Sequence, residues 1–234
     1  MNRLDKTQIL AHFALRIAAD AHDLPLVVRL TDAACSILGV DGVSITVEPA
    51  TDNRLTLHAT DDVAAQLEEL QDVLAEGPCW QSYLSGSPVS ADLSDETDAR
   101  WPQFSAAARD AVGHRTLTCL PVRPVNDVLA VLSTHQRGST SLAMDMDGAT
   151  FLAATIGAAL LQDPQGAEPD MQSGPWSARL EIHQATGMIM GQLGIDGSNA
   201  LALLRAHAFA QDTTVDAIAA QILDRALTFR EEPL

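Results

Sequence analysis

Three cysteines, Cys35, Cys79 and Cys119, are the side chains best suited to redox or nucleophilic chemistry. Cys35 falls on the apolar face of a predicted helix and Cys119 within a predicted strand, where a free cysteine usually packs as a small core residue. Cys79 follows Pro78 near a predicted helix start, where the helix dipole lowers the pKa of a thiol. Two interpretations therefore stay open for Cys79, core packing and redox chemistry. The odd cysteine number predicts a reducing compartment and no disulfide framework.

Other catalytic or metal-binding patterns do not occur in the sequence. The seven histidines show no HxxxH spacing and no neighbouring acid cluster, so we predict no metal site. There is no glycine-rich phosphate loop, nucleophile elbow or pair of acids placed for general acid–base catalysis. Trp101 and Phe104 flank Pro102 and fit either a pocket wall or a core plug. We therefore expect neither an enzyme nor a bound cofactor.

The chain is strongly acidic, with a formal net charge of −17. Residues 1–175 carry −14 of that charge, so we expect this part to bind no nucleic acid. The longest uncharged segment, 148–162, is shorter than the roughly 20 apolar residues that span a bilayer. The N-terminus shows no basic segment followed by an apolar run, so no signal peptide is predicted. These features predict a cytoplasmic protein without a membrane partner.

The last quarter of the chain has the spacing of three short helices. Ile182, Ala185, Ile189 and Leu193 recur on one helical face, with Ser177 as the expected cap and Gly194 as the end. A second helix over 198–211 places Leu201, Leu204 and Ala208 on one side. A third opens with Thr213 three residues before Asp216 and repeats Val215, Ile218, Ala219, Ile222 and Leu223. The pattern predicts a small all-α bundle.

The bundle contains three motifs in order, Gln184-Ala185-x-Gly187-x-x-Met190, Leu204-Arg205-x-x-Ala208 and Ala219-x-x-Ile222. Together they resemble the ANTAR domain, an RNA-binding module of bacterial antiterminators. The chain departs from many members at Thr186, where they have a lysine, and at Gly191, where they have a charged residue. The resemblance implies a three-helix ANTAR domain at 176–234 that binds hairpin RNA through Arg179, His183, Gln184, Thr186, Gly187, Arg205, Thr214 and Ala219.

The charge of the bundle bears on that function. From Trp176 onward the chain has four arginines and seven acidic residues, a net charge of −3. Phosphate neutralisation supplies most nonspecific affinity for nucleic acids, so we expect weak general RNA binding that depends on shape and on unstacked loop bases. DNA is not an expected partner. The alternative is a protein-docking bundle that acts as a signalling adaptor without RNA binding.

A Pro/Gly-rich segment over 162–175 predicts a linker between two domains. Before it, apolar spacing and turn residues predict helices at 5–21, 24–38, 61–75, 103–111 and 146–161, with a short helical turn around Cys79. Strands are predicted at 43–47, 55–59, around Val89, at 116–122 and at 128–134, with turns at 49–53 and 124–127. This order predicts an α+β domain with a mainly antiparallel sheet and flanking helices.

The front domain, residues 1–161, contains the motifs Thr60-Asp61, Leu70-Gln71, Glu76-Gly77-Pro78-Cys79, Arg100-Trp101-Pro102-x-Phe104 and Gly113. Over roughly residues 20–161 it resembles a GAF domain of the variant joined to ANTAR modules. The resemblance implies a sensor whose pocket is lined by Cys79, Trp80, Tyr83, Trp101, Phe104 and Cys119. The sequence departs from the family on the strand after Asn126, where relatives often have a Gly and a Leu-Asn-Leu-Tyr-like end and this chain has Val131–His135; ligand contacts that the family makes there do not carry over to this chain.

Together, the two resemblances imply an RNA-binding transcription antitermination regulator. Its GAF domain would sense an unknown small-molecule or protein signal, and its ANTAR domain would bind hairpin RNA and prevent terminator formation. We expect a homodimer that packs through the apolar faces of 5–21 and 146–161. Some GAF domains reduce free methionine sulfoxide with cysteines, which makes a redox enzyme the more distant alternative if the fold brings the three thiols together.

Overall fold

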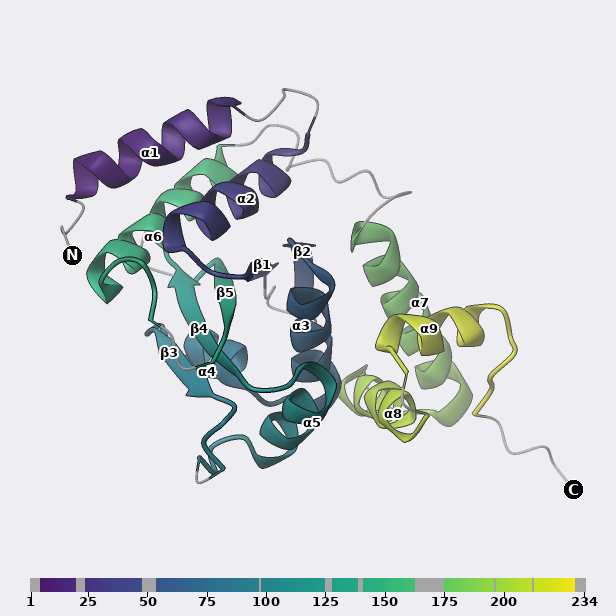
Figure 1. Cartoon of the computed structure of the whole chain (residues 1–234). Helices are drawn as coiled ribbons and strands as arrows, with labels where there is room; N and C mark the ends of the chain where they lie inside the picture. The colour runs from purple at the N-terminus through teal and green to yellow at the C-terminus, as the bar shows by residue number, and fades with distance from the viewer. Residues whose placement is uncertain are drawn as a thin grey trace, which may run out of the picture. The chain divides into compact units, whose positions relative to one another are not determined.

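The computed structural model describes residues 5–19, 24–47, 54–96, 98–124, 128–138, 141–162, 175–195, 197–211 and 213–229. The chain divides into two compact units, the first with the sheet and six helices and the second with three helices (Figure 1). Each unit has its own buried apolar cluster. None of the helices in the described ranges has the length and apolar character needed to cross a membrane.

The first unit contains a five-stranded sheet. Its strands are β1 (Gly42–Val47), β2 (Leu55–Ala59), β3 (Val89–Asp92), β4 (Arg115–Val122) and β5 (Ala130–Arg137), in the order β2-β1-β5-β4-β3. Every neighbouring pair is antiparallel. This confirms the predicted α+β class. β5 runs three residues beyond the predicted end at Thr134, because His135 pairs with Gly42 on β1 and Arg137 with Arg115 on β4.

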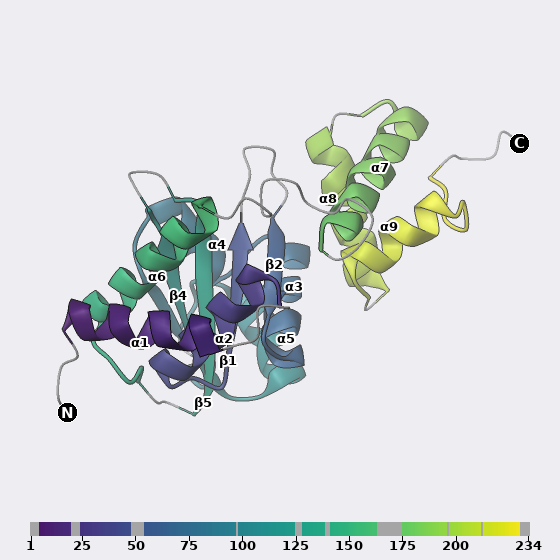
Figure 2. The same cartoon turned by 90° about the horizontal axis from the view of Figure 1, so that it is seen from above.

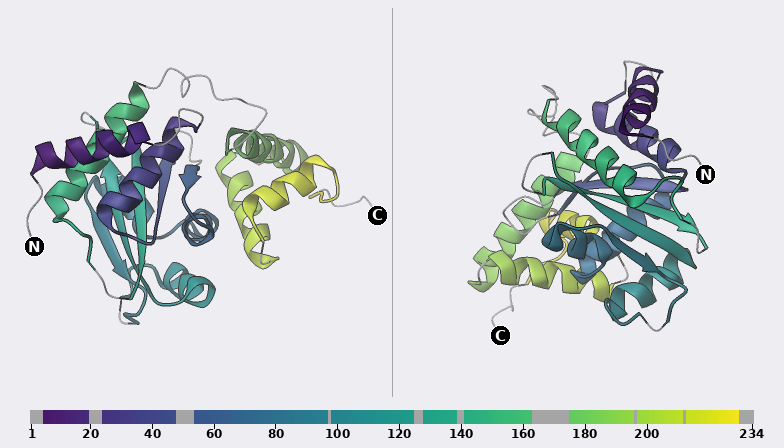
Figure 3. Two further views of the ribbon diagram at one scale, coloured as in Figure 1. Left: turned by 45° about the horizontal axis from the view of Figure 1, so that its top comes forward. Right: turned by 90° about the vertical axis from the view of Figure 1, so that its left-hand side faces the viewer.

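One face of this sheet is apolar. Helices α1 (Lys6–Ala19), α2 (Leu26–Leu38) and α6 (Met146–Leu161) lie on that side (Figure 3, right). The strands supply alternate residues, as the two-residue period of a strand requires, and these pack with the helices in one buried cluster. Its members include Val43, Ile45, Leu120, Val122, Leu132, Leu30, Leu152 and Ile156. Ile9 and Phe13 attach α1 to it, whereas Leu15 on α1 is exposed.

The opposite face is covered by α3 (Asp62–Leu74) and α4 (Pro78–Ser85), and α5 (Pro102–Val112) lies on the same side (Figure 3). Asp61 is the N-cap of α3, because its carboxylate accepts a hydrogen bond from the Ala64 amide at 2.7 Å. α4 begins at Pro78, where a proline costs no helical hydrogen bond. These starts fix which side chains point toward the sheet.

The second unit consists of α7 (Pro175–Leu193), α8 (Gly197–Ala210) and α9 (Val215–Leu223) (Figure 2). Its core contains Ala185, Ile189, Ala200, Leu201, Leu204, Ala208, Val215, Ile218, Ala219 and Ile222, which confirms the predicted apolar faces. Gly194 ends α7 with a φ of +67°, as predicted. Leu193 was placed on the buried face but is 40% exposed, because it lies at the last turn beyond the packed part of the helix.

Two helices in this unit begin at residues other than those predicted. The N-cap of α9 is Thr214 and not Thr213, since the Thr214 hydroxyl accepts from the Ala217 amide at 2.9 Å. α7 begins at Pro175, before the cap predicted at Ser177, so the last residue of the predicted linker is helical. The rest of that linker, residues 163–174, lies outside the described residues, as do the predicted turn residues 49–53 and 125–127.

Candidate functional site

Small polar side chains and a thiol occupy the second face of the sheet. Ser44 on β1, Cys119 on β4 and Ser133 on β5 point away from the apolar cluster, and none is more than 5% exposed. They alternate with Val43, Leu120 and Leu132, which belong to the opposite face. Hydroxyls and thiols at these positions leave the sheet surface able to hydrogen-bond whatever covers it.

A buried ion pair lies above this polar face. Arg54 donates from Nη2 to the Glu68 carboxylate on α3, and both side chains are only 2% exposed. The Ser44 hydroxyl donates to the other Glu68 oxygen at 2.9 Å, which ties the pair to β1. The guanidinium also lies over the Trp80 ring, 5.3 Å from its centroid. Two charges out of water are tolerated here because each has several partners.

Cys79, at the start of α4, joins the same group. Arg54 Nη2 donates to Cys79 Sγ at 2.9 Å. Burial nevertheless raises the pKa of Cys79 to about 12, since the loss of hydration outweighs the attraction of the neighbouring guanidinium. The expected lowering of this pKa by the helix start is therefore wrong. Burial likewise raises the pKa of Cys119 well above its usual value.

The turn that carries Cys79 is fixed by Gln71 of α3. The Gln71 side-chain oxygen accepts from the Cys79 amide at 2.8 Å, and the Gln71 carbonyl accepts from the Trp80 indole N–H at 3.0 Å. Gly77 has a φ of +140°, and a Cβ there would lie 2.5 Å from Gln71 Oε1. Only glycine fits this approach of the loop to the glutamine. The Leu70-Gln71 and Glu76–Cys79 motifs are therefore one structural unit.

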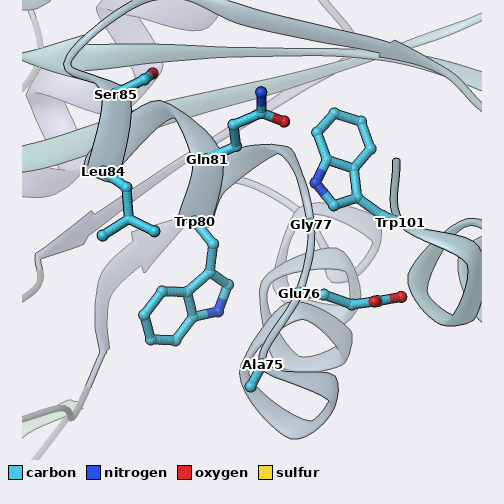
Figure 4. A pocket seen from close by; sticks show the side chains of 8 residues that line it. All are labelled: Ala75, Glu76, Gly77, Trp80, Gln81, Leu84, Ser85 and Trp101. Atoms are coloured by element: carbon cyan, nitrogen blue, oxygen red, sulfur yellow. The ribbon is translucent and has the colours of Figure 1, made fainter. Parts of the chain in front are cut away.

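An open hollow of about 460 Å³ lies beside α4 (Figure 4). It is lined by Ala75, Glu76, Gly77, Trp80, Gln81, Leu84, Ser85 and Trp101. The Glu76 carboxylate accepts a hydrogen bond from the Phe104 amide at 2.6 Å, which satisfies a free N–H at the start of α5. Glu76 and the Arg100–Phe104 motif thus hold one wall of the hollow together.

The six predicted pocket residues separate into two groups. Trp80 and Trp101 line the hollow. Cys79 and Cys119 do not, because they are buried with Val131 between helix and sheet, with Tyr83 packed against them. Phe104 does not line it either, since its side chain is completely buried. This hollow is therefore lined by two of the six predicted residues.

Sequence reasoning missed a buried histidine network at the end of β5. Because arginine has only donors, His135 Nδ1 accepts from Arg115 Nη1 at 3.1 Å, and Nε2 therefore carries the proton that it donates to Asp61 at 3.0 Å. Gly42 leaves room for it, since a Cβ there would lie 2.3 Å from His135 Nε2. The acid is 74 positions away in sequence, so only strand alternation with Ser133 could have indicated that His135 faces this layer.

In the helical unit, the predicted RNA-binding residues have different surroundings. Gln184 and Gly187 are exposed on α7, opposite the buried Ala185 and Ile189. The half-buried Thr186 donates from its hydroxyl to the Ile182 carbonyl at 2.7 Å. The side chains of Arg179 and His183 lie outside the described part of the chain, and Arg205 lies on α8.

Two of the residues predicted to bind RNA have structural roles in the bundle. Ala219 is completely buried between the helices, so its side chain is not available to RNA, and its place in the motif reflects packing. The Thr214 hydroxyl is occupied as the cap of α9. On α7, Gly187 and Gly191 are exposed, and no atom in the described ranges lies within 4 Å of a Cβ built at either, its own helix backbone aside.

No group of three or more His, Cys, Asp or Glu side chains in the described ranges is placed to hold a metal ion. The Cys35 thiol donates to the Val40 carbonyl at 3.3 Å and belongs to a different part of the unit from Cys79 and Cys119. The fold thus brings two of the three cysteines together.

Comparisons with known proteins identify two domains in the chain. A GAF domain model matches residues 26–161, and an ANTAR domain model matches residues 177–223. The GAF domain of a phosphoenolpyruvate-protein phosphotransferase from Coxiella burnetii is similar in fold, with 15% identity, a TM-score of 0.52, and coverage of 72% of this chain and 100% of that one.

The GAF domain of the Acinetobacter phosphoenolpyruvate-protein phosphotransferase aligns with 13% identity and a TM-score of 0.45, over 69% of this chain and 97% of that one. The comparison with curated proteins found no match. At 15% identity the Coxiella burnetii structure shows the fold alone, and the domain models carry the family assignment. The chain belongs to the GAF domain family, and its GAF domain is followed by an ANTAR domain.

Proposed function

We propose that this protein is a cytoplasmic transcription antitermination regulator whose ANTAR domain binds hairpin RNA and whose GAF domain senses a signal. Binding would stabilise an antiterminator hairpin and prevent a competing terminator, with two chains acting as a homodimer on paired hairpins. The observation that carries the proposal is the ANTAR match at residues 177–223 together with the exposed face of α7 at Gln184, Gly187 and Gly191.

The ANTAR domain is acidic overall, and Thr186 and Gly191 stand where many relatives have cations, so attraction to phosphate contributes little. A glycine inside a helix costs about 1 kcal/mol relative to alanine. Two such glycines on one exposed face allow RNA to come close to the helix backbone, where shape and base contacts decide affinity.

Gly187→Leu tests that face. A Cβ built at Gly187 meets no atom within 4 Å in the described ranges, its own helix backbone aside, and leucine is a better helix former, so the thermal midpoint should be retained or rise. Binding to a tandem hairpin RNA, measured by electrophoretic shift, should weaken at least about tenfold, a loss near 1.4 kcal/mol. Ala202→Leu adds similar bulk at an exposed position on α8 and serves as the control. Equal binding by wild type and both variants would place the RNA elsewhere.

Arg205→Ala tests the second helix. If this guanidinium contacts a phosphate or loop base, its removal should weaken hairpin binding by about 1–3 kcal/mol. Arg225→Ala removes the same charge from an exposed position after α9 and controls for general electrostatics. Equal losses for the two variants would mean that net charge, and not a specific contact, sets the affinity.

The second candidate is a protein-interaction adaptor. The net charge of −3 on residues 176–234 and the exposed Phe209, 62% accessible on α8, favour it. The same shift experiment separates the two functions. A folded protein that binds no tandem hairpin RNA at low salt, where electrostatic repulsion and attraction are both strongest, supports the adaptor and rejects the regulator.

A further inference from the structure

We propose that Cys79 and Cys119 form a reversible intramolecular disulfide when a small uncharged hydroperoxide reaches them, which makes this pair a redox modification site of the GAF domain. The two thiols come from different elements, the start of α4 and the middle of β4, and are 40 positions apart. Neither the hollow beside α4 nor the RNA-binding proposal uses them.

The geometry that carries the proposal is the shared environment of the two sulfurs. Cys119 Sγ lies 3.6 Å from the Ser133 hydroxyl, and Cys79 hydrogen-bonds to the same side chain. With Val131 they make one buried cluster. The Ser82 hydroxyl, one helical turn after Cys79, donates to the Cys119 carbonyl at 3.2 Å and ties α4 to β4 at this point. Both thiols therefore contact one side-chain hydroxyl, that of Ser133, inside the same buried cluster.

The charges around the pair indicate which thiol attacks the peroxide and which one then forms the disulfide. Arg54 donates to Cys79 Sγ at 2.9 Å, so its guanidinium stabilises the Cys79 thiolate, whereas Cys119 has Ser133 as its hydrogen-bond partner. Glu68, paired with Arg54, raises the pKa of both thiols, and the Cys79 thiolate further raises the pKa of Cys119. Cys79 is therefore the attacking thiol, and Cys119 is the thiol that resolves the product.

The reaction balances with hydrogen peroxide as the oxidant. The Cys79 thiolate attacks one peroxide oxygen, the O–O bond breaks, and the departing hydroxide takes a proton and leaves as water. Cys119 then attacks the sulfur of the Cys79 sulfenic acid and forms the S–S bond. The hydroxyl of the sulfenic acid leaves with the Cys119 proton as a second water. Two thiols are oxidised and one peroxide is reduced. A dithiol reductant reverses the change.

Burial determines which oxidants react and how fast. Cys79 is 2% and Cys119 0% exposed, which favours small neutral oxidants over bulky disulfides such as oxidised glutathione. Because burial raises the pKa of Cys79 to about 12, little thiolate is present near neutrality and the reaction is slow. Its rate should rise about tenfold per pH unit below that value, as the thiolate fraction does.

The site is tested in a Cys35→Ser background, which removes the remaining, half-buried thiol. The purified full-length protein is treated with hydrogen peroxide, denatured, alkylated and weighed by mass spectrometry. The expected product is lighter by two hydrogen atoms before alkylation, takes up no alkyl group at either cysteine, and regains both sites after dithiothreitol. Two fully alkylated cysteines, after an exposure that oxidises Cys35 in the wild type, would overturn the proposal.

Single substitutions separate a reactive pair from two packed residues. With Cys119→Ser in the same background, Cys79 should stop at the sulfenic acid and react with dimedone, whereas Cys79→Ser should leave Cys119 unmodified. Equal labelling of both variants would contradict the assigned roles. A variant that does not fold does not decide the matter, because the mass measurement on Cys35→Ser alone still tests the disulfide.

A regulatory use of the disulfide rests on the proposed function, whereas its formation does not. Hairpin binding is therefore measured on reduced and oxidised Cys35→Ser protein of known mass. An affinity that changes at least threefold and recovers with dithiothreitol supports redox control. An unchanged affinity for RNA overturns that control while RNA binding stands, and absent binding in both states counts against the antiterminator itself.

Discussion

The two faces of the GAF sheet are built from the same strands and differ in what they bury. Adjacent residues Leu132 and Ser133 on β5 point to opposite sides, one into an aliphatic cluster under α2 and α6 and the other toward an ion pair and two thiols. The apolar face is held by burial of surface, which is not directional. The polar face is stabilised by hydrogen bonds and ion pairs between specific side chains. A substitution there leaves a buried polar group without its partner, which costs stability.

The buried ion pair should give the largest effect. Glu68→Leu leaves the Arg54 guanidinium buried without its carboxylate and should destabilise the GAF domain by about 3–5 kcal/mol in denaturant unfolding. The double variant Arg54→Met/Glu68→Leu removes both charges and should recover most of the loss. A double variant as unstable as the single one would mean that the remaining partners of these side chains, and not the pairing of charges, stabilise this face.

On the apolar face, Leu132→Ala should cost about 3 kcal/mol, because it removes a completely buried side chain and leaves a cavity. The measurement is again the free energy of unfolding. The loss should not depend on pH, since the buried side chains that make up the cluster around Leu132 are all apolar. A strong pH dependence of the loss would show that the two faces are coupled through the sheet.

The pH response should belong to the polar face. Cys79 has a pKa near 12 in the folded protein against an ordinary value of 9.0, so its contribution is complete below pH 9. Between these values the unfolded chain loses the proton while the folded protein keeps it, so stability falls as pH rises, by up to about 1.4 kcal/mol per pH unit. Unfolding measured below and above pH 9 should show a smaller slope for Cys79→Ser. Equal slopes would assign the effect to other groups.

The smallest expected effect comes from the residue next to Leu132. Ser133→Ala removes the hydroxyl shared by the two thiols and should cost about 1 kcal/mol, the scale of a single hydrogen bond. The substitution leaves the strand and the opposite face intact. The difference between its loss in unfolding free energy and that of Leu132→Ala therefore compares a hydrogen bond on the polar face with a buried side chain on the apolar face. A loss as large as that of Leu132→Ala would mean that Ser133 contributes mainly by packing.

Much of the fold followed from local pattern. Apolar residues recur at two- and four-residue intervals along the predicted strands and helices, and capping or turn residues such as Asp61 and Gly194 fix where elements begin or end. The errors lie at ends: β5 is longer than predicted because both its neighbours pair with it, and α9 is capped by Thr214 and not Thr213. Such limits depend on pairing partners that a local window does not contain.

The sequence by itself determined the two domains' resemblances, the three-helix spacing and the acidic charge, since these depend on residues close together in the chain. Only the tertiary structure decided that Cys79 and Cys119 meet while Cys35 does not, and that His135 finds Asp61. It also decided that burial, and not the helix start, sets the pKa of Cys79. The physical reason is that solvation and electrostatic interaction depend on distance in space, which the order of residues fixes only after folding.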